Sequence, residues 1–225
     1  GQAEPVIRRL VKRSAWLARP LARLFAWREV RALRRLVGLK GVPQLIRYEQ
    51  GVLYRSYMPG VTVAQARPQD PAFYGAMKRL MRQVHLRGVA HNDAAKRVNW
   101  LVLEDGSPGL IDFQLSLVFR RRHGRLFRLA RREDLRHILK HKKFNIRQTM
   151  TARERRMEKR RSALGWAWRW LYKRPYLFVT RKILGWADRE GQGLGAELDR
   201  GATRDWEGAP KTPTSKERSE HGGQS

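Results

Sequence analysis

The chain has 225 residues, a length that supports one domain with room for a tail. Its 49 Lys and Arg residues outnumber its 20 Asp and Glu residues, and the resulting net charge of +29 indicates a polyanionic partner. Cysteine is absent, which excludes disulfides and thiolate metal sites, and no apolar run is long enough to span a membrane. The apolar residues Val6 and Ile7 are followed directly by the charged Arg8 and Arg9, so this stretch lacks the apolar run of a secretory signal. We therefore expect a cytoplasmic protein, with the inner face of the membrane as a second location.

The first 60 residues alternate short β-branched runs with one helical stretch. Val6–Lys12 predicts a strand, and Trp16–Leu36 predicts a helix with Pro20 as a break near its start. The apolar residues at helical spacing are Leu17, Leu21, Leu24, Phe25, Leu33 and Leu36. Two further strands are predicted at Leu45–Glu49 and Val52–Tyr57, joined by a two-residue turn that contains glycine. This order predicts a small sheet accompanied by a single helix.

The next 100 residues are predicted to be mainly helical. Pro71 opens a helix whose apolar residues share one face, and this helix ends at Gly88. Arg120–Arg132 is a dense basic stretch on which a polyanionic acceptor could dock. Further helices are predicted over Arg132–Lys142 and Thr151–Arg161, and the second begins with a capping-box pattern.

The residues that carry chemistry lie between the helix that ends at Gly88 and a predicted hairpin. The segment reads His91-Asn92-Asp93-Ala94-Ala95-Lys96-Arg97-Val98-Asn99, then the strands Trp100–Leu103 and Gly109–Ile111, then Asp112. Asp93 can accept or orient the proton of an attacking hydroxyl. Asn99 and Asp112 offer oxygen atoms, the ligands that Mg²⁺ prefers. Each residue alone is common at turns and strand ends, but together and in this order they predict a phosphate-transfer site.

The C-terminal part of the sequence mixes aromatic and basic residues. Ala163–Trp186 combines tryptophan and tyrosine with arginine and lysine, and the chain beyond Glu190 has the composition of a disordered tail. The aromatic residues could pack onto the core with the cations in water, which we favour. They could instead meet an anionic membrane surface or lipopolysaccharide. Stacking on RNA bases is the third alternative.

The order of the chemical groups resembles the catalytic and metal loops of the protein-kinase superfamily, H-R-D-L-x-x-x-N followed by D-F-G. The resemblance covers about Val6 to Leu139 and is nearest to RIO-type atypical serine/threonine kinases and bacterial lipopolysaccharide-core kinases. It implies an α+β, protein-kinase-like fold of two lobes, with a reduced N-terminal lobe and a mainly helical C-terminal lobe. We place the reduced lobe and hinge in residues 1–60, the helical lobe in 61–189 and the tail in 190–225.

The resemblance also implies roles for single residues in nucleotide binding. Lys12 would contact the α- and β-phosphates of ATP, and Glu29 would hold Lys12 through an ion pair. Tyr57 would lie in the hinge beside the adenine, within the segment Tyr54–Pro59. In this reading the cofactors are ATP and Mg²⁺, with Asn99 and Asp112 as the metal ligands.

Three more residues receive roles around the catalytic loop. His91 belongs to the catalytic motif, but the resemblance implies that it braces the loop backbone rather than doing chemistry. Lys96 either reaches the transferred phosphoryl group or is a solvated surface lysine. Asp134 would brace the catalytic loop from the helix below it.

The sequence departs from the family pattern in five places. Asn92 stands where the motif has arginine, and no A-P-E triplet follows Asp112. No Gly-rich loop precedes Lys12, so the hairpin that covers the phosphates is missing from this stretch. Asn99 comes one residue later than usual, so the loop must bulge to deliver it. Gln114 replaces the glycine of the metal loop and restricts that backbone.

We therefore expect an ATP- and Mg²⁺-dependent kinase that moves the γ-phosphoryl group to a hydroxyl. The acceptor would be serine or threonine of a protein, or a sugar of the lipopolysaccharide core. The alternative is a catalytically degenerate kinase-like protein that binds RNA or an anionic membrane through its basic surface. The expected partners are a nucleotide and a polyanionic or protein acceptor, and the sequence indicates no oligomeric state.

Overall fold

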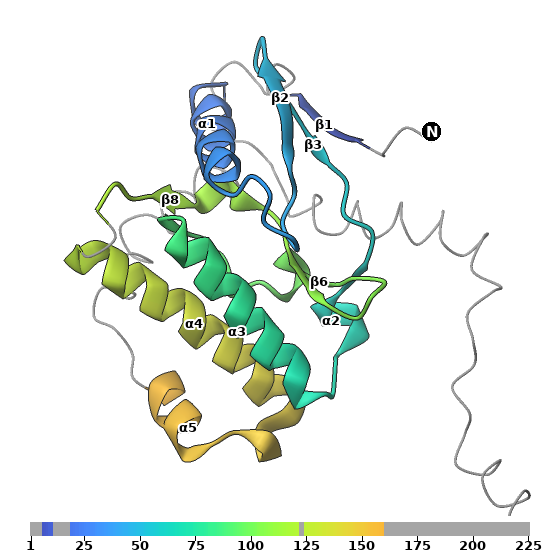
Figure 1. Cartoon of the computed structure of the whole chain (residues 1–225), viewed down its shortest axis with the longest axis vertical. Coiled ribbons are helices and arrows are strands. Elements are labelled where there is room, and N and C mark those ends of the chain that lie inside the picture. Colours follow the sequence, from blue (N-terminus) through green and yellow to red (C-terminus); the bar gives the residue numbers. More distant parts are fainter. Residues whose placement is uncertain (1–5, 11–18, 122–123, 160–225) are drawn as a thin grey trace, which may run out of the picture. The chain divides into compact units, whose positions relative to one another are not determined.

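The computed structural model describes residues 6–10, 19–121 and 124–159 (Figure 1). The chain divides into two units, residues 1–184 and 185–225, and every described residue belongs to the first. Lys12, the aromatic block at Ala163–Trp186 and the predicted tail lie outside the described residues. Of the helices that the structure describes, none has the length and apolar content needed to cross a membrane.

The N-terminal sheet has three antiparallel strands in the order β1-β3-β2. The strands are β1 (Val6–Leu10), β2 (Leu45–Glu49) and β3 (Val52–Ser56). Gln50 and Gly51, between β2 and β3, both have positive φ angles of 49° and 77°. Two successive left-handed residues make the hairpin turn whose twist suits antiparallel strands. The two predicted strands and their turn are therefore confirmed.

A single helix, α1 (Arg19–Arg35), accompanies this sheet. Pro20 lies in its first turn, where the missing backbone N–H costs no hydrogen bond, so this proline starts the helix rather than breaking it. Of the apolar residues that set the predicted spacing, Phe25, Leu33 and Leu36 are buried, but Leu24 is 40% exposed. The helix packs against β2 and also against the segment that follows Asp112.

The main helix of the second part is α3 (Pro71–Leu86), which matches the predicted helix closely. The side chain of Asp70 caps its N-terminus by accepting a hydrogen bond from the backbone N–H of Ala72 at 2.8 Å. The predicted apolar face is fully confirmed, because its members are all buried: Phe73, Met77, Leu80, Met81 and Val84.

The helix α4 (Arg125–Ile146) begins seven residues earlier than the predicted start at Arg132. Much of the basic stretch is therefore helical, and Asp134 lies inside α4 rather than near its start. Arginine is a good helix former, and Phe127 in the first turns is buried against His85 of α3, with ring centroids 6.2 Å apart. This tertiary contact extends the helix toward its N-terminus.

The remaining elements are short and connect the helices. Two further antiparallel sheets have the orders β4-β6-β7 and β5-β8. The strands are β4 (Val61–Thr62), β5 (Val89–Ala90), β6 (Trp100–Val102), β7 (Pro108–Leu110) and β8 (Leu117–Val118). The helical segments are α2 (Val63–Ala66), the 3₁₀ turns η3 (Arg97–Asn99), η4 (Phe113–Leu115) and η5 (Arg147–Thr149), and α5 (Ala152–Lys159).

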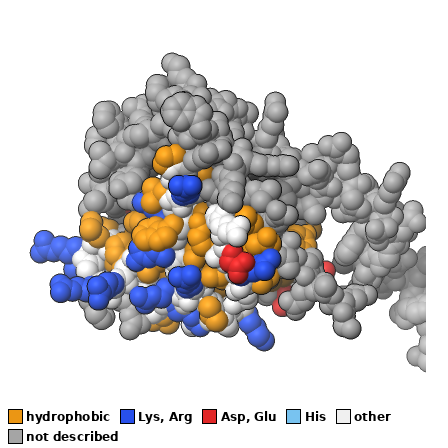
Figure 2. All heavy atoms as spheres, turned by 90° about the horizontal axis from the view of Figure 1, so that it is seen from above, with side chains coloured by type: hydrophobic (Ala, Val, Ile, Leu, Met, Phe, Trp, Pro, Cys, Tyr) orange, Lys and Arg blue, Asp and Glu red, His pale blue; other side chains and the backbone are white. Residues whose placement is uncertain are grey.

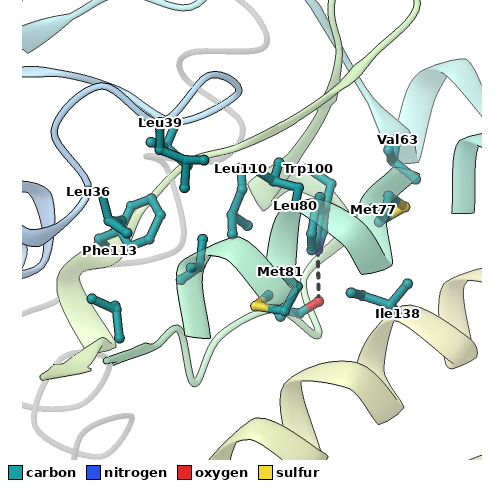
Figure 3. Close-up of a cluster of buried hydrophobic side chains, with 14 of the residues drawn as sticks. Leu36, Leu39, Val63, Met77, Leu80, Met81, Trp100, Leu110, Phe113 and Ile138 are labelled. Atoms are coloured by element: carbon teal, nitrogen blue, oxygen red, sulfur yellow. Dashed lines mark hydrogen bonds between the residues drawn. The ribbon is translucent and has the colours of Figure 1, made fainter. Parts of the chain in front are cut away.

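One apolar core joins these elements (Figure 3). It receives side chains from α1, α3, α4 and the β6–β7 hairpin, and Trp100 of β6 is fully buried at its centre. The indole N–H of Trp100 donates a hydrogen bond to the carbonyl of Ala94 at 3.1 Å. The core therefore holds in place both the β6–β7 hairpin and the loop that carries Asp93.

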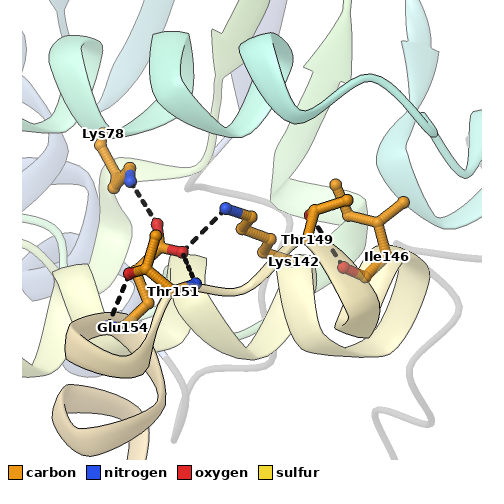
Figure 4. Close-up of polar contacts among 6 residues, drawn as sticks. All are labelled: Lys78, Lys142, Ile146, Thr149, Thr151 and Glu154. Carbon is orange, nitrogen blue, oxygen red and sulfur yellow. Dashed lines mark hydrogen bonds and ion pairs between the residues drawn. The ribbon is translucent and has the colours of Figure 1, made fainter.

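The helix α5 is attached through one buried carboxylate, that of Glu154 (Figure 4). Thr151 and Glu154 form the predicted capping box, with reciprocal hydrogen bonds of 3.0 and 3.1 Å. Glu154 also accepts from Lys78 of α3 at 2.7 Å and from Lys142 of α4 at 2.8 Å. Burial opposes the charge, but the two lysines outweigh it and lower the pKa of Glu154 to about 2.

The predicted fold class is confirmed: the protein has an α+β architecture. A small sheet with one helix is followed by a mainly helical part, and a short hairpin between α3 and α4 carries the candidate residues (Figure 1).

Candidate active site

The loop between β5 and β6 holds the carboxylate of Asp93 in a buried position, with only 1% of the residue exposed. Lys96 Nζ lies 2.9 Å from Asp93 Oδ2, and Asn99 Nδ2 donates to the same oxygen at 3.2 Å. Asn99 Nδ2 also lies 3.1 Å from the backbone carbonyl of Asp93. One ammonium and one amide therefore fix the orientation of this carboxylate, and Lys96 is attached to the predicted base.

Both ring nitrogens of His91 are used by backbone groups. Because a carbonyl only accepts hydrogen bonds, the 3.0 Å contact with Ile111 O requires a proton on His91 Nε2. His91 Nδ1 then accepts from the backbone N–H of Asp93 at 3.3 Å. The ring is also fully buried. His91 therefore braces the loop, and it offers no nitrogen for proton transfer.

Asp134 supports the same loop from α4, and it is fully buried. Its carboxylate accepts from the backbone N–H groups of His91 and Asn92, both at 2.9 Å, and from His85 Nε2 at 3.0 Å. Burial opposes ionisation, but the hydrogen bond from His85 and the attraction to both imidazoles hold the pKa of Asp134 below its usual value. The bracing role that the resemblance implied for Asp134 is present in the structure.

Backbone hydrogen bonds join the segment directly before Asp112 to the loop that carries Asp93 and Asn99. The N–H of Ile111, the residue before Asp112, donates to Asn99 O at 2.9 Å, while its carbonyl accepts from His91. Asn99 is the last residue of the 3₁₀ turn η3. Ile111, directly before Asp112, is thus hydrogen-bonded to the loop that carries Asp93 through both its N–H and its carbonyl.

Asp112 has the features expected of a cation ligand. Its backbone is left-handed, with φ of 65°, and its Oδ1 is buried without a hydrogen-bond partner in the described part of the chain. Because the Asn99 amide nitrogen donates to Asp93, the amide oxygen is oriented away from this bond. Carboxylate and amide oxygens such as these are the kind of ligand that Mg²⁺ prefers. Among the described residues, no three His, Asp or Glu side chains gather as a metal site.

Gln114 does not disturb this arrangement, because it lies in the 3₁₀ turn η4 and the left-handed backbone falls on Asp112. Asn92, which stands where the family motif has arginine, also takes a left-handed conformation, with φ of 62°. Its side chain donates to Leu115 O at 3.1 Å and so ties the catalytic loop to the end of η4. Asparagine tolerates this backbone better than most residues.

The predicted nucleotide-binding residues are only partly described. Lys12 lies outside the described residues, so its expected ion pair with Glu29 stays a prediction. Glu29 is fully buried on α1, and its Oε1 lies 3.1 Å from Arg55 Nη1 of β3. Tyr57 is half-buried directly after β3, at the start of the connection to β4. The structure therefore adds Arg55 to the neighbourhood of Glu29.

Sequence reasoning missed two residues of this region, although each left a signal. His85 lies on the apolar face of the α3 pattern, four residues after Met81, and a buried histidine requires a polar partner. Arg55 lies two residues from the buried Leu53 in β3, so both side chains point to the same face of the sheet. A charged residue on an inward face indicates a buried acidic partner.

No protein-family model matches the sequence, and a search of curated proteins finds no relative. Solved structures with a similar fold include the Rio2 kinase from Chaetomium thermophilum, with 17% identity, 61% of this chain and 45% of that chain covered, and a TM-score of 0.47. Another is the same organism's Rio2 kinase in an ADP/Mg²⁺-phosphoaspartate complex, with 15% identity, 81% and 55% coverage, and a TM-score of 0.46. This chain spans about half the length of these structures. Likenesses this distant say nothing of activity, so function is inferred from the chain's own geometry.

Proposed function

We propose that the protein is a kinase-like phosphotransferase that uses ATP and Mg²⁺ to phosphorylate a hydroxyl. The observation that carries this proposal is the joined set of Asp93, Asn99 and Asp112. Asp93 is buried and held by Lys96 and Asn99, while Ile111 connects Asp112 to the same loop. A structural turn would need neither the buried carboxylate of Asp93 nor, among the described residues, an Asp112 Oδ1 that is buried without a hydrogen-bond partner.

The reaction breaks the bond between the γ-phosphorus and its bridging oxygen and forms a bond from phosphorus to the acceptor oxygen. Asp93 orients the acceptor hydroxyl and takes its proton, an effect typically worth about 10²–10⁴-fold in rate. Lys96 Nζ, at 2.9 Å from Asp93 Oδ2, would hold this carboxylate in position for the acceptor. Asp112 and the Asn99 amide oxygen would hold Mg²⁺, which neutralises charge on the transferred group.

The test combines nucleotide binding with turnover in matched carboxylate variants. Asp112→Asn should lose the Mg²⁺ dependence of ATP binding, because it removes the charged metal ligand. Asp93→Asn should bind ATP with Mg²⁺ as the wild type does but lose at least about 10²-fold in transfer. Glu104→Gln is the control, since it removes an exposed carboxylate from the neighbouring hairpin. Equal turnover in wild type and Asp93→Asn would end the assignment of the base.

The second candidate is a kinase-shaped binding protein that has lost transfer and uses its charge on RNA or an anionic membrane. The observation that favours it is the surplus of basic groups, a net +29, which a single nucleotide does not require. It predicts no turnover in any variant. It also predicts binding to RNA or anionic vesicles that falls steeply as salt is raised.

A further inference from the structure

The backbone on both sides of Asp93 is hydrogen-bonded to α4. The N–H groups of the two residues before Asp93 donate to the carboxylate of Asp134, both at 2.9 Å. On the other side, the carbonyl of Ala94 accepts from His141 Nε2 at 2.7 Å. Because a carbonyl only accepts, this contact requires a proton on His141 Nε2. Asp93 therefore lies on a short piece of chain whose two ends are attached to one helix.

Asp134 and His141 share one face of α4. They are seven residues apart, which is about two helical turns and a rise of about 10 Å. Four residues of extended chain can span that length. Both residues are buried, with 0% of Asp134 and 4% of His141 exposed. Burial also lowers the pKa of His141, so its ring is uncharged at pH 7. The two attachment points are thus held at a fixed separation by the helix.

The carbonyl of Ala94 receives a second donor from within the loop region itself. Trp100 Nε1 donates to it at 3.1 Å, and Ala94 is fully buried. Trp100 directly follows Asn99, whose side chain donates to the carbonyl of Asp93 at 3.1 Å. These internal bonds hold the shape of the loop, but they move with it. His141 comes from a distant part of the chain, so its bond fixes where the loop lies.

We propose that His141 is a positioning residue for Asp93, an inference that rests on the proposed phosphotransferase function. His141 holds the backbone directly after the base, while Asp134 holds the backbone directly before it. With both ends attached, the carboxylate of Asp93 keeps its place relative to the acceptor hydroxyl. With the second end released, the loop can turn about the first, and a displacement of about 1 Å can cost about 10²-fold in rate.

The test compares His141→Gln with His141→Asn in the full chain. Both variants remove the imidazole and keep a side-chain amide. The glutamine N–H₂ group can reach the place of His141 Nε2, whereas the asparagine side chain is one CH₂ shorter and does not reach the carbonyl of Ala94. The readout is phosphate release from ATP with Mg²⁺, with water as the acceptor.

The kinetic constants should divide in a way that lost stability alone does not produce. His141→Asn should lower kcat about tenfold or more, and His141→Gln should stay within about threefold of wild type. The KM for ATP should change less than about twofold in both variants, because the carbonyl of Ala94 is not a proposed nucleotide contact. Equal kcat values in His141→Asn and wild type would overturn the proposal.

Amide hydrogen exchange in the protein without nucleotide gives a second readout. The N–H of Lys96 donates to the carbonyl of Asp93 at 3.3 Å, so its exchange reports how often the loop opens. Exchange at Lys96 should be faster in His141→Asn than in His141→Gln or wild type. The same rate in all three proteins would show that His141 does not hold the loop.

Two control variants separate positioning from a general loss of stability. Tyr74→Phe removes a buried hydroxyl that bonds Asn145 near the same end of α4, and it should lower stability but not kcat. Trp100→Phe removes the other donor to the Ala94 carbonyl but leaves the loop attached to α4. It should therefore lower kcat less than His141→Asn does. Equal losses of kcat in all three variants would overturn the proposal in favour of destabilisation.

Surface charge should not contribute to this difference. Lys and Arg side chains stand among apolar ones on the described surface shown in Figure 2, but Asp134 and His141 are buried. Salt screens exposed charges and acts much less on buried groups. The difference in kcat between His141→Gln and His141→Asn should therefore persist at high salt, and its disappearance would overturn the proposal.

Turnover and exchange separate this proposal from the proposed function. If wild type releases phosphate and both variants match it, the phosphotransferase function stands and His141 is not a positioning residue. If wild type neither binds nor turns over ATP with Mg²⁺, the phosphotransferase function fails. Exchange at Lys96 then decides alone: faster exchange in His141→Asn supports the attachment of the loop by His141, and unchanged exchange overturns it.

Discussion

Replacing Asp134 by alanine is expected to destabilise the protein and loosen the catalytic loop together. The carboxylate is fully buried and is the acceptor for three donors, the backbone N–H groups of His91 and Asn92 and the ring of His85. A buried donor without a partner costs about 1–3 kcal/mol, and Asp134→Ala would leave three of them. We therefore expect a loss of about 4 kcal/mol in the free energy of unfolding, since the three costs add only in part.

Asp134→Asn should cost less, about 2 kcal/mol, because one amide oxygen still accepts a hydrogen bond while the amide NH₂ faces a donor. Urea unfolding followed by tryptophan fluorescence measures both variants, with Glu104→Ala as an exposed control. The pKa of Asp134 is lowered, so its stabilisation is present above the unfolded value of 3.8 and is lost as the pH falls below it. The difference in the free energy of unfolding between wild type and Asp134→Asn should therefore become smaller below pH 3.8. A loss under about 1 kcal/mol in Asp134→Ala at pH 7 would refute the bracing role.

Two further predictions concern groups whose pKa values are shifted by burial and partners. Glu154→Gln should lower stability at pH 7 by about 1–3 kcal/mol, because Lys78 and Lys142 lose the charge they share. This difference in the free energy of unfolding should shrink as the pH falls from 4.5 toward about 2, because Glu154 takes up a proton in that range. Urea unfolding at several pH values across the range measures the difference. A difference that stays constant would contradict the ion-pair account. Burial lowers the pKa of His137 to about 4 in the folded protein. As the pH falls, the unfolded chain therefore takes up a proton at a higher pH than the folded chain does. The free energy of unfolding of the wild type should accordingly decrease between pH 6.5 and about 4. His137→Gln should reduce that slope, which urea midpoints at several pH values report, and an unchanged slope would exclude His137 as a contributor.

Elements with strong local signals were predictable from the sequence. The β2–β3 hairpin is specified by its two-residue turn with glycine, and α3 by Pro71 together with an apolar residue at every third or fourth position. The capping box at Thr151 and Glu154 is equally local, because its hydrogen bonds join residues three apart. In each case the information lies within a few neighbouring residues.

The first turns of α4 could not be predicted in this way. Residues 125–131 belong to the stretch Arg120–Arg132, which was predicted to lie before the helix, but Phe127 is buried against His85, which is 42 positions away in sequence. That contact exists only after α3 and α4 have packed. Tertiary packing here decides where the helix begins.

The candidate site also has a part that could be predicted from the sequence and a part that depends on tertiary packing. The order Asp93, Asn99, Asp112 is visible in the sequence because the chemistry fixes the residue types and approximate spacing. The partners that hold these groups, such as His85 with Asp134 and Arg55 with Glu29, come from distant elements and have no local pattern. Sequence reasoning therefore found the groups proposed to react, while the structure supplied most of what positions them.

The two backbone groups of Ile111 have a consequence for how an ion at Asp112 would affect the loop that carries Asp93. The carbonyl of Ile111 accepts a hydrogen bond from His91 and its N–H donates to Asn99, so the backbone that leads to Asp112 is bonded to that loop. A cation bound at Asp112 would restrain this backbone and, through these hydrogen bonds, the loop as well. Amide hydrogen exchange at Asn92 and Asp93 should therefore slow when a divalent cation binds at Asp112.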